Sequence, residues 1–145
     1  MSVHNGESYT NEAINSILGQ TLTDWEFLIV NDGSTDGTKT ILKQYASDDS
    51  RIKILTNPKN IGLTKSLNLA IRQAKAEFIA RQDADDISAP SRLEKQLIYM
   101  KTHPTIAVLG CLDSSFNEDG IIQTATDNKL SPAQIKQYLR RGNLF

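Results

Sequence analysis

The stretch Trp25-Glu-Phe-Leu-Ile-Val-Asn-Asp-Gly-Ser-Thr-Asp-Gly37 contains the transition that decides the fold class. Residues 25–30 are apolar except for Glu26, which is typical of a strand buried on both faces of a parallel sheet. Residues 31–37 predict a loop, because Gly, Asn, Asp and Ser favour turns. An amphipathic helix is then expected over residues 36–46. This order of strand, loop and helix predicts an α/β domain.

Strands and helices alternate on both sides of this stretch. Further strands are expected at residues 1–3, 52–55, 77–80 and 106–112, and another begins at residues 121–122 after a turn at 117–120. Further helices are expected at residues 9–18, 63–74, 91–102 and 131–139. Ser91 and Glu94 predict a capping box at the start of the third of these helices. The pattern predicts a mostly parallel sheet flanked by helices.

Bulk composition narrows the class of partner. The 145 residues suit one domain, and a net charge of −1 argues against binding of nucleic acid. The single cysteine, Cys111, excludes an internal disulfide and lies in an apolar run, where we expect it to be buried. No apolar run is long enough for a membrane span. These features predict a cytoplasmic protein, and peripheral association with a membrane stays compatible with them.

Three carboxylates follow the strand expected at residues 77–80. Asp83, Asp85 and Asp86 crowd into four positions, and their mutual repulsion costs free energy unless a cation or water separates them. Mg²⁺ and Mn²⁺ prefer oxygen ligands of this kind, often completed by substrate phosphates. The alternative for such a cluster is a solvated acidic turn. The cluster alone leaves both readings open.

The position of the cluster in the fold favours a ligand site. Polar stretches at residues 5–7, 31–36 and 83–86 each follow an expected strand. In open α/β sheets, ligands bind at the carboxyl ends of parallel strands. We therefore expect the three stretches to lie along one edge of the sheet and to form a binding site together.

Two common nucleotide motifs are missing, which limits the choice of ligand. The loop after residues 1–3 has one glycine, Gly6, so the fingerprint of NAD- or FAD-binding domains is absent, and so is a phosphate-binding loop ending in Gly-Lys-Ser/Thr. Asp32 stands where a carboxylate can bind a base or ribose, or else bond its own turn. Asp36 is expected to cap the following helix. A nucleotide held by two loops, with a metal on its diphosphate, accounts for all three polar stretches.

Several short motifs follow one another along the chain. They are, in order, Ser2-Val-His-Asn-Gly-Glu7, Ser16-Ile-Leu-Gly-Gln-Thr-Leu22, Phe27-Leu-Ile-Val-Asn-Asp-Gly-Ser-Thr-Asp36, Asn60-Ile-Gly-Leu63, Asp83-Ala-Asp-Asp86, Pro90 and Arg92-Leu93. With these motifs, the sequence resembles the inverting glycosyltransferases of family 2 along its whole length. These enzymes have the Rossmann-like GT-A fold and use a nucleotide-diphosphate sugar with Mn²⁺ or Mg²⁺. The resemblance therefore implies a GT-A domain over residues 1–145, incomplete at both ends, with a UDP-sugar as the donor and a saccharide or lipid-linked acceptor.

The resemblance also implies roles for individual residues. Asp85 would lie closest to the metal and diphosphate, with Asp86 a weaker candidate for the same place. Asp83 would contact the ribose or sugar side and the metal, and Asp32 would bond the base, most often uracil. Lys65 lies where a basic residue of the family approaches the nucleotide, although a solvated helix lysine is the alternative. The nucleoside would be held by the first loop, through Ser2, Asn5 and Glu7.

The implied reaction is attack by an acceptor hydroxyl on the anomeric carbon, which needs a carboxylate base. In the family this base lies well after the metal motif, so we expect it beyond Phe145 and no catalytic residue within the chain. Asp119 lies in an expected hairpin turn and is rejected as the base. The chain alone is therefore expected to bind a nucleotide without sugar transfer. The alternatives are a non-catalytic nucleotide-sugar-binding module and a sugar nucleotidyltransferase, whose glycine-rich basic loop is absent here.

Overall fold

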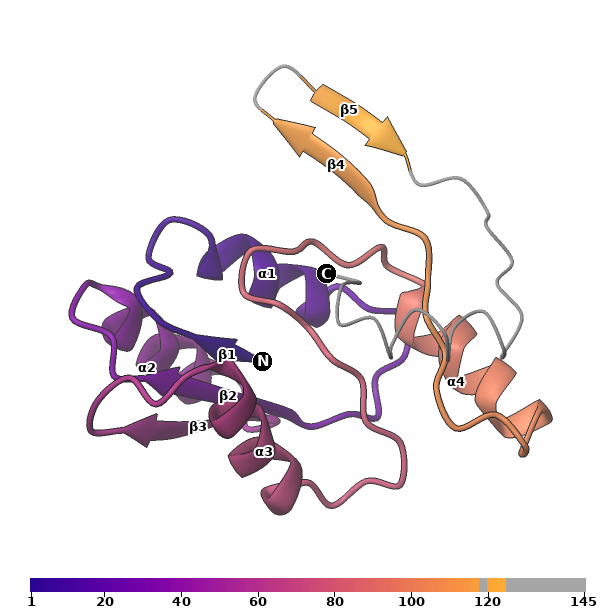
Figure 1. Ribbon diagram of the computed structural model, residues 1–145, viewed down its shortest axis with the longest axis horizontal. Coiled ribbons are helices and arrows are strands. Elements are labelled where there is room, and N and C mark those ends of the chain that lie inside the picture. Colours follow the sequence, from indigo (N-terminus) through magenta and orange to yellow (C-terminus); the bar gives the residue numbers. More distant parts are fainter. Residues whose placement is uncertain (118–119, 125–145) are drawn as a thin grey trace, which may run out of the picture. The chain divides into compact units, whose positions relative to one another are not determined.

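The computed structural model describes residues 1–117 and 120–124 (Figure 1). The chain divides into two compact units, residues 1–107 and residues 108–145. The first unit contains all the residues to which a role in binding was assigned.

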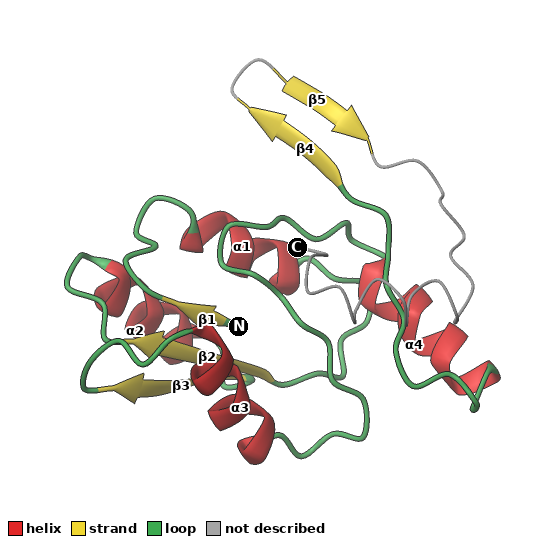
Figure 2. Ribbon diagram, in the orientation of Figure 1, coloured by secondary structure: helices red, strands yellow, loops and turns green. Residues whose placement is uncertain are grey.

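A three-stranded parallel sheet forms the centre of the first unit (Figure 2). Its strands are β1 (Ser2–Val3), β2 (Phe27–Asp32) and β3 (Ile52–Asn57), and they lie side by side in that order. The register pairs Asp32 with Asn57 at the carboxyl ends of β2 and β3. Because the strands are parallel, the loops that follow them share one edge of the sheet. The α/β class with a parallel sheet is confirmed.

Four helices accompany the sheet, each close to its expected place. They are α1 (Thr10–Leu18), α2 (Thr38–Asp48), α3 (Leu63–Gln73) and α4 (Arg92–Thr102). The capping box predicted at α4 was wrong. The Ser91 side chain makes no capping hydrogen bond, and the Glu94 carboxylate instead accepts a hydrogen bond from the Thr21 hydroxyl, at 2.7 Å. The helix expected at residues 131–139 lies outside the described residues.

The two faces of β2 meet different helices. Side chains alternate along a strand, so Phe27 and Ile29 share one face, whereas Val30 and Asp32 share the other. The first face packs in the main core against α1 and α2; the second lies toward α3, where Ser66 and the end of β3 approach Asp32. The buried members of the main core are Met1, Val3, Ala13, Ile14, Ile17, Phe27, Ile29, Leu42 and Ile52.

The strand expected at residues 77–80 was wrong. These residues run through irregular backbone between α3 and α4, and Ile79 is 55% exposed. The open edges of the sheet are β1 and β3, and residues 77–80 pair with neither. β1 is only two residues long and offers few backbone groups for a ladder. The acidic turn at residues 83–86 is therefore carried by a long loop rather than by the end of a strand.

The buried strand expected at residues 106–112 was also wrong. The backbone there is irregular, Val108 is 87% exposed, and Cys111 is exposed rather than buried. A strand of this apolar kind needs cover on both faces, and the described residues do not supply it.

In the second unit, β4 (Ser114–Asn117) pairs antiparallel with β5 (Gly120–Thr124), as the turn expected at residues 117–120 requires. Among the described helices, none has the length and apolar character of a membrane span.

Candidate functional site

A pocket of about 360 Å³ lies beside the carboxyl end of β1. It brings together Ser2 from β1 and Asn5 from the loop after β1, called the first loop, with Asp83 and Asp85 from the acidic turn. Residues more than 75 positions apart in the chain thus face one cavity, although the acidic turn does not follow a strand and no residue of the expected stretch 31–36 lines the cavity. Glu7, Asp32, Lys65 and Asp86 do not line it. The lining residues are Ser2, Val3, His4, Asn5, Gly6, Tyr9, Leu63, Asp83, Ala84 and Asp85.

The carboxylates in the pocket differ in their surroundings. Both oxygens of Asp83 accept hydrogen bonds from the Arg81 guanidinium, at 2.9 and 2.7 Å, in a half-exposed ion pair. The exposed Asp85 side chain forms no hydrogen bond or ion pair with the described residues. An exposed ion pair contributes at most about 1 kcal/mol, so Arg81 could yield to a stronger partner. Asp85 is the carboxylate most available to a cation.

The donor set fits a divalent cation that shares its shell with a substrate. Asp83 and Asp85 supply hard oxygen donors, but the described residues contain no group of three or more Asp, Glu, His or Cys placed to hold a metal ion. Mg²⁺ typically uses one or two carboxylates and completes its shell with water and substrate phosphates. Two carboxylates beside a cavity therefore suit a cation that arrives with a phosphate-bearing ligand.

The first loop is fastened to the loop that follows β2. Asn5 has a positive φ of 52°, and its side-chain oxygen accepts a hydrogen bond from the Thr35 N–H at 2.8 Å. The Asn5 N–H donates to the Ser34 hydroxyl, and the Gly6 N–H donates to the Thr38 hydroxyl. Asparagine tolerates this left-handed backbone better than most residues. Asn5 therefore shapes the wall of the pocket as well as lining it.

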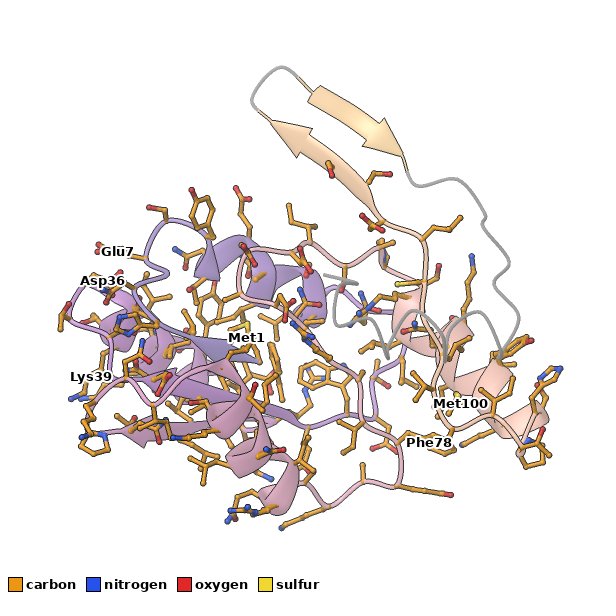
Figure 3. The ribbon with its side chains drawn as sticks, in the orientation of Figure 1. Met1, Glu7, Asp36, Lys39, Phe78 and Met100 are labelled. Atoms are coloured by element: carbon orange, nitrogen blue, oxygen red, sulfur yellow. The ribbon has the colours of Figure 1, made fainter. Side chains whose placement is uncertain are left out.

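Glu7 lies at the tip of the same loop, next to Asp36 (Figure 3). Its carboxylate accepts a hydrogen bond from the Gly37 N–H at 2.8 Å, while the Glu7 N–H donates to Asp36 Oδ2. Asp36 also accepts from the Thr38 N–H, but the expectation that it caps α2 was wrong, because the N-cap residue is Gly37 and the Asp36 side chain bonds from one position before it. Glu7 therefore links the first loop to the loop after β2 by hydrogen bonds and does not line the pocket.

Asp32 is buried, with 2% of its surface exposed, and holds the loop before α3. Its oxygens accept hydrogen bonds from Asn57 Nδ2 and from the Ile61 and Gly62 N–H groups, at 2.8 to 2.9 Å. Burial raises the pKa of Asp32, but these hydrogen bonds outweigh burial and hold the pKa below its ordinary value. The Ser66 hydroxyl also contributes a hydrogen bond that lowers the pKa of Asp32. A carboxylate has about four acceptor positions, so contact with a base would displace a protein donor.

We expect Asp32→Asn to lower the free energy of unfolding at pH 7 by about 2–3 kcal/mol, because hydrogen bonds to a charged acceptor are lost. The pKa of Asp32 is lower in the folded chain, so its stabilisation is present at neutral pH and is lost as pH falls through that pKa. Urea denaturation at about pH 7 and pH 3 measures this, and the gap between wild type and variant should shrink at pH 3. An equal gap at both pH values would contradict a role for the Asp32 charge.

Several residues that line the pocket were not predicted from the sequence. His4 contributes a ring whose Nδ1 is 2.9 Å from the Asp32 carbonyl oxygen, and Tyr9 and Leu63 are 59% and 49% exposed. Large apolar or aromatic groups that stay exposed at a pocket suit the flat face of a ligand ring. Their only sequence signal is their nearness to Asn5 and Gly62. Lys65 is exposed on α3 and, within the described part of the chain, forms no ion pair.

A second, larger groove of about 460 Å³ lies between α1 and α2. It contains one carboxylate, Asp48, whose oxygens already accept hydrogen bonds from Gln44. No loop from the carboxyl edge of the sheet reaches it, so we do not take it as the site. Its lining residues are Asn11, Thr40, Ile41, Gln44, Tyr45 and Asp48.

Comparison with known proteins places the chain in a family. The profile described as glycosyl transferase family 2 matches residues 1–145. The chain belongs to this family. It is 43% identical over 122 residues to the putative glycosyltransferase EpsE of Bacillus subtilis, covering 83% of the chain and 44% of EpsE. It is 40% identical over 122 residues to the O-antigen biosynthesis glycosyltransferase WbnJ of Escherichia coli, covering 83% of the chain and 47% of WbnJ.

A solved structure shares the fold of this family 2 member. Residues 1–349 of S. aureus TarS in complex with UDP superpose with a TM-score of 0.67 and 27% identity, covering 81% of this chain and 38% of that one. The expected GT-A fold is thereby confirmed. The chain spans about half the length, or less, of EpsE, WbnJ and residues 1–349 of TarS.

Proposed function

We propose that this chain is the donor-binding part of an inverting glycosyltransferase that moves a sugar from a nucleotide-diphosphate sugar to a saccharide or lipid-linked acceptor. The observation that carries the proposal is the pocket in which Asp83 and Asp85 face the first loop, in a chain that belongs to glycosyl transferase family 2. UDP is the preferred nucleotide, because TarS is a relative solved with UDP. The O-antigen biosynthesis role in the name of WbnJ supports a saccharide acceptor.

The acidic turn is assigned to the diphosphate. Asp85 is the principal metal ligand, Asp83 binds the metal or the sugar side after release from Arg81, and Asp86 is a weaker candidate at the same turn. Mn²⁺ or Mg²⁺ bound there would neutralise the charge that grows on the departing diphosphate. The carboxylates orient the leaving group and hold it near the first loop.

The nucleoside is assigned to the first loop. Ser2 and Asn5 line the pocket, and His4 and Tyr9 offer ring faces against which a base can stack. Glu7 supports the loop through Gly37. Asp32 contributes by holding the loop before α3, and a base contact from it remains a prediction. Lys65, in the first turn of α3, is proposed to approach the diphosphate as a point charge.

The catalytic base is assigned to a region after Phe145, so that residues 1–145 act as one donor-binding domain. A non-catalytic nucleotide-sugar-binding module would share this pocket and differ only in lacking the base. A sugar nucleotidyltransferase is disfavoured, because the loop after β1 carries one glycine and no Lys or Arg within residues 4–9. A measurement of nucleotide binding therefore tests the assignment of the pocket, whereas a measurement of sugar transfer tests the whole protein, including the base.

Titration calorimetry of the chain with UDP, GDP and CDP, each with and without Mn²⁺, tests the proposal. We expect UDP to bind at least about tenfold more tightly with Mn²⁺ than without it, because the metal links the carboxylates to the diphosphate. Uridine, which has no phosphate, is the matched ligand control and should show no metal dependence. Equal affinity for UDP with and without Mn²⁺ would contradict the metal-bridged pocket.

A further inference from the structure

A buried amide lies directly behind the acidic turn. Gln82 is 3% exposed, and its Nε2 donates hydrogen bonds to the main-chain carbonyl oxygens of Asp83, at 3.1 Å, and Asp86, at 2.7 Å. These two carbonyls bracket Asp85. One side chain therefore spans the turn that carries the pocket carboxylates.

The other end of the same amide is also held. Gln82 Oε1 accepts hydrogen bonds from the Ser88 hydroxyl at 2.6 Å and from Arg92 Nη2 at 3.3 Å. Arg92 is the first residue of α4, and the Ser88 N–H donates to the Ser16 hydroxyl on α1. An amide offers two donors and an acceptor oxygen, and all of these are engaged. Gln82 thus connects the turn to two helices.

The turn depends on this connection because no sheet ladder supports it. Residues 77–82 form no strand, and the backbone hydrogen bond across the turn, from the Asp86 N–H to the Asp83 carbonyl, is long at 3.4 Å. Three neighbouring carboxylates also repel one another, which favours opening of the turn. The two hydrogen bonds from Gln82 oppose that opening.

We propose that Gln82 is a positioning residue that holds the acidic turn in the conformation that binds the metal–diphosphate unit. Its amide acts through the backbone of Asp83 and Asp86 and does not line the pocket. The inference rests on the proposed function, since it assigns the turn to a cation and a diphosphate. Partners that orient metal ligands typically account for about 10–100-fold in metal affinity.

The first test replaces Gln82 by methionine, which keeps the volume and removes the amide. We expect the affinity for UDP in the presence of Mn²⁺ to fall about tenfold, the lower end of that range, because the turn samples open conformations. The affinity for UDP without Mn²⁺ should stay unchanged, since it does not use the turn. Titration calorimetry gives both values, and thermal unfolding reports the accompanying loss of stability.

Gln20 offers a matched control for stability. It is also a buried glutamine, 6% exposed, and its amide bonds the Ser16 and Ala89 carbonyls and the Leu93 N–H without touching the acidic turn. Gln20→Met should lower the melting temperature to a similar extent and leave the Mn²⁺-dependent affinity for UDP near wild type. An equal loss of that affinity in both variants would reduce Gln82 to a general stabilising residue and overturn the inference.

Gln82→Glu provides a second variant if the methionine variant does not fold. Glutamate keeps the oxygen facing Ser88 and Arg92 but removes the donor to the two carbonyls. Its added negative charge alone would strengthen Mn²⁺ binding, so weaker binding isolates the lost donor. If Gln82→Glu binds UDP in the presence of Mn²⁺ as tightly as the wild type or more tightly, the inference about Gln82 is overturned and the proposed function is not. Absence of any Mn²⁺ dependence in the wild type overturns the metal role in the proposed function, and the inference with it.

Discussion

Replacing Asp85 by asparagine is expected to weaken the binding of UDP in the presence of Mn²⁺ by about 100-fold or more, since even indirect partners of metal ligands account for about 10–100-fold. Asp85 lines the pocket, and its side chain forms no hydrogen bond or ion pair within the part of the chain that the structure describes. The substitution keeps the shape and removes the charge. Binding of UDP without metal should change little. Titration calorimetry with and without Mn²⁺ measures the effect.

Two further variants isolate the position of that charge. Asp24→Asn removes one exposed carboxylate outside the pocket and should leave the affinity for UDP unchanged. Asp83→Asn should cause a smaller loss than Asp85→Asn, because Asp83 already shares its charge with Arg81. Should Asp85→Asn bind UDP and Mn²⁺ as the wild type does, the metal would have to be assigned elsewhere.

Gly33→Ala is expected to lower the free energy of unfolding by about 4 kcal/mol, because strain in left-handed backbone costs about 1–2 kcal/mol and overpacking typically about 1–3 kcal/mol. Gly33 has a φ of +69°, and an added Cβ would lie 2.4 Å from the carbonyl carbon of Lys59 and 2.6 Å from the amide nitrogen of Asn60. Main-chain atoms at that distance cannot rotate away. Urea denaturation of the variant and the wild type measures the difference.

Gly110→Ala is the matched control. Its added Cβ would meet no atom within 4 Å, and its φ is not positive, so its stability should stay within about 0.5 kcal/mol of wild type. Gly33 lies at the end of β2, where the loop passes against the segment that leads to α3. If Gly33→Ala unfolds at the same urea concentration as Gly110→Ala, the loop at Gly33 does not lie as close to the main chain of Lys59 and Asn60 as the structure shows.

Periodicity and turn chemistry predicted most elements of the first unit. The apolar run at residues 25–30 became β2 with a shift of two residues at each end, and the helices α1 to α4 lie within two residues of their expected starts. These patterns depend on local side-chain spacing, which the sequence displays directly. The strands expected at residues 77–80 and 106–112 failed for a different reason. A strand requires a partner and cover, and neither is a property of the apolar run itself.

Of the candidate site, too, one part was predicted from the sequence and another was not. The acidic turn was identified from its residue types and from the family resemblance, and the structure places it with Asn5 at one pocket although the strand expected before the turn is absent. What could not be predicted was which polar groups bond each other. Asn5 with Thr35 and Glu7 with Gly37 are pairs separated by 30 positions, and their bonds exist because β1 and β2 are adjacent. The same contact makes Glu7 a support for the loop instead of a wall of the pocket.

The sequence by itself determined the α/β class, the order of the helices and the presence of carboxylates suited to a hard cation, because spacing and residue type carry that information. Only the tertiary structure decided how each carboxylate is used. Asp32 is enclosed by donors from the loop before α3, Asp83 is paired with Arg81, and Asp85 alone of these three faces the pocket without a described partner. The physical reason is that a carboxylate's availability depends on the donors that folding brings within hydrogen-bonding distance, and these come from distant parts of the chain.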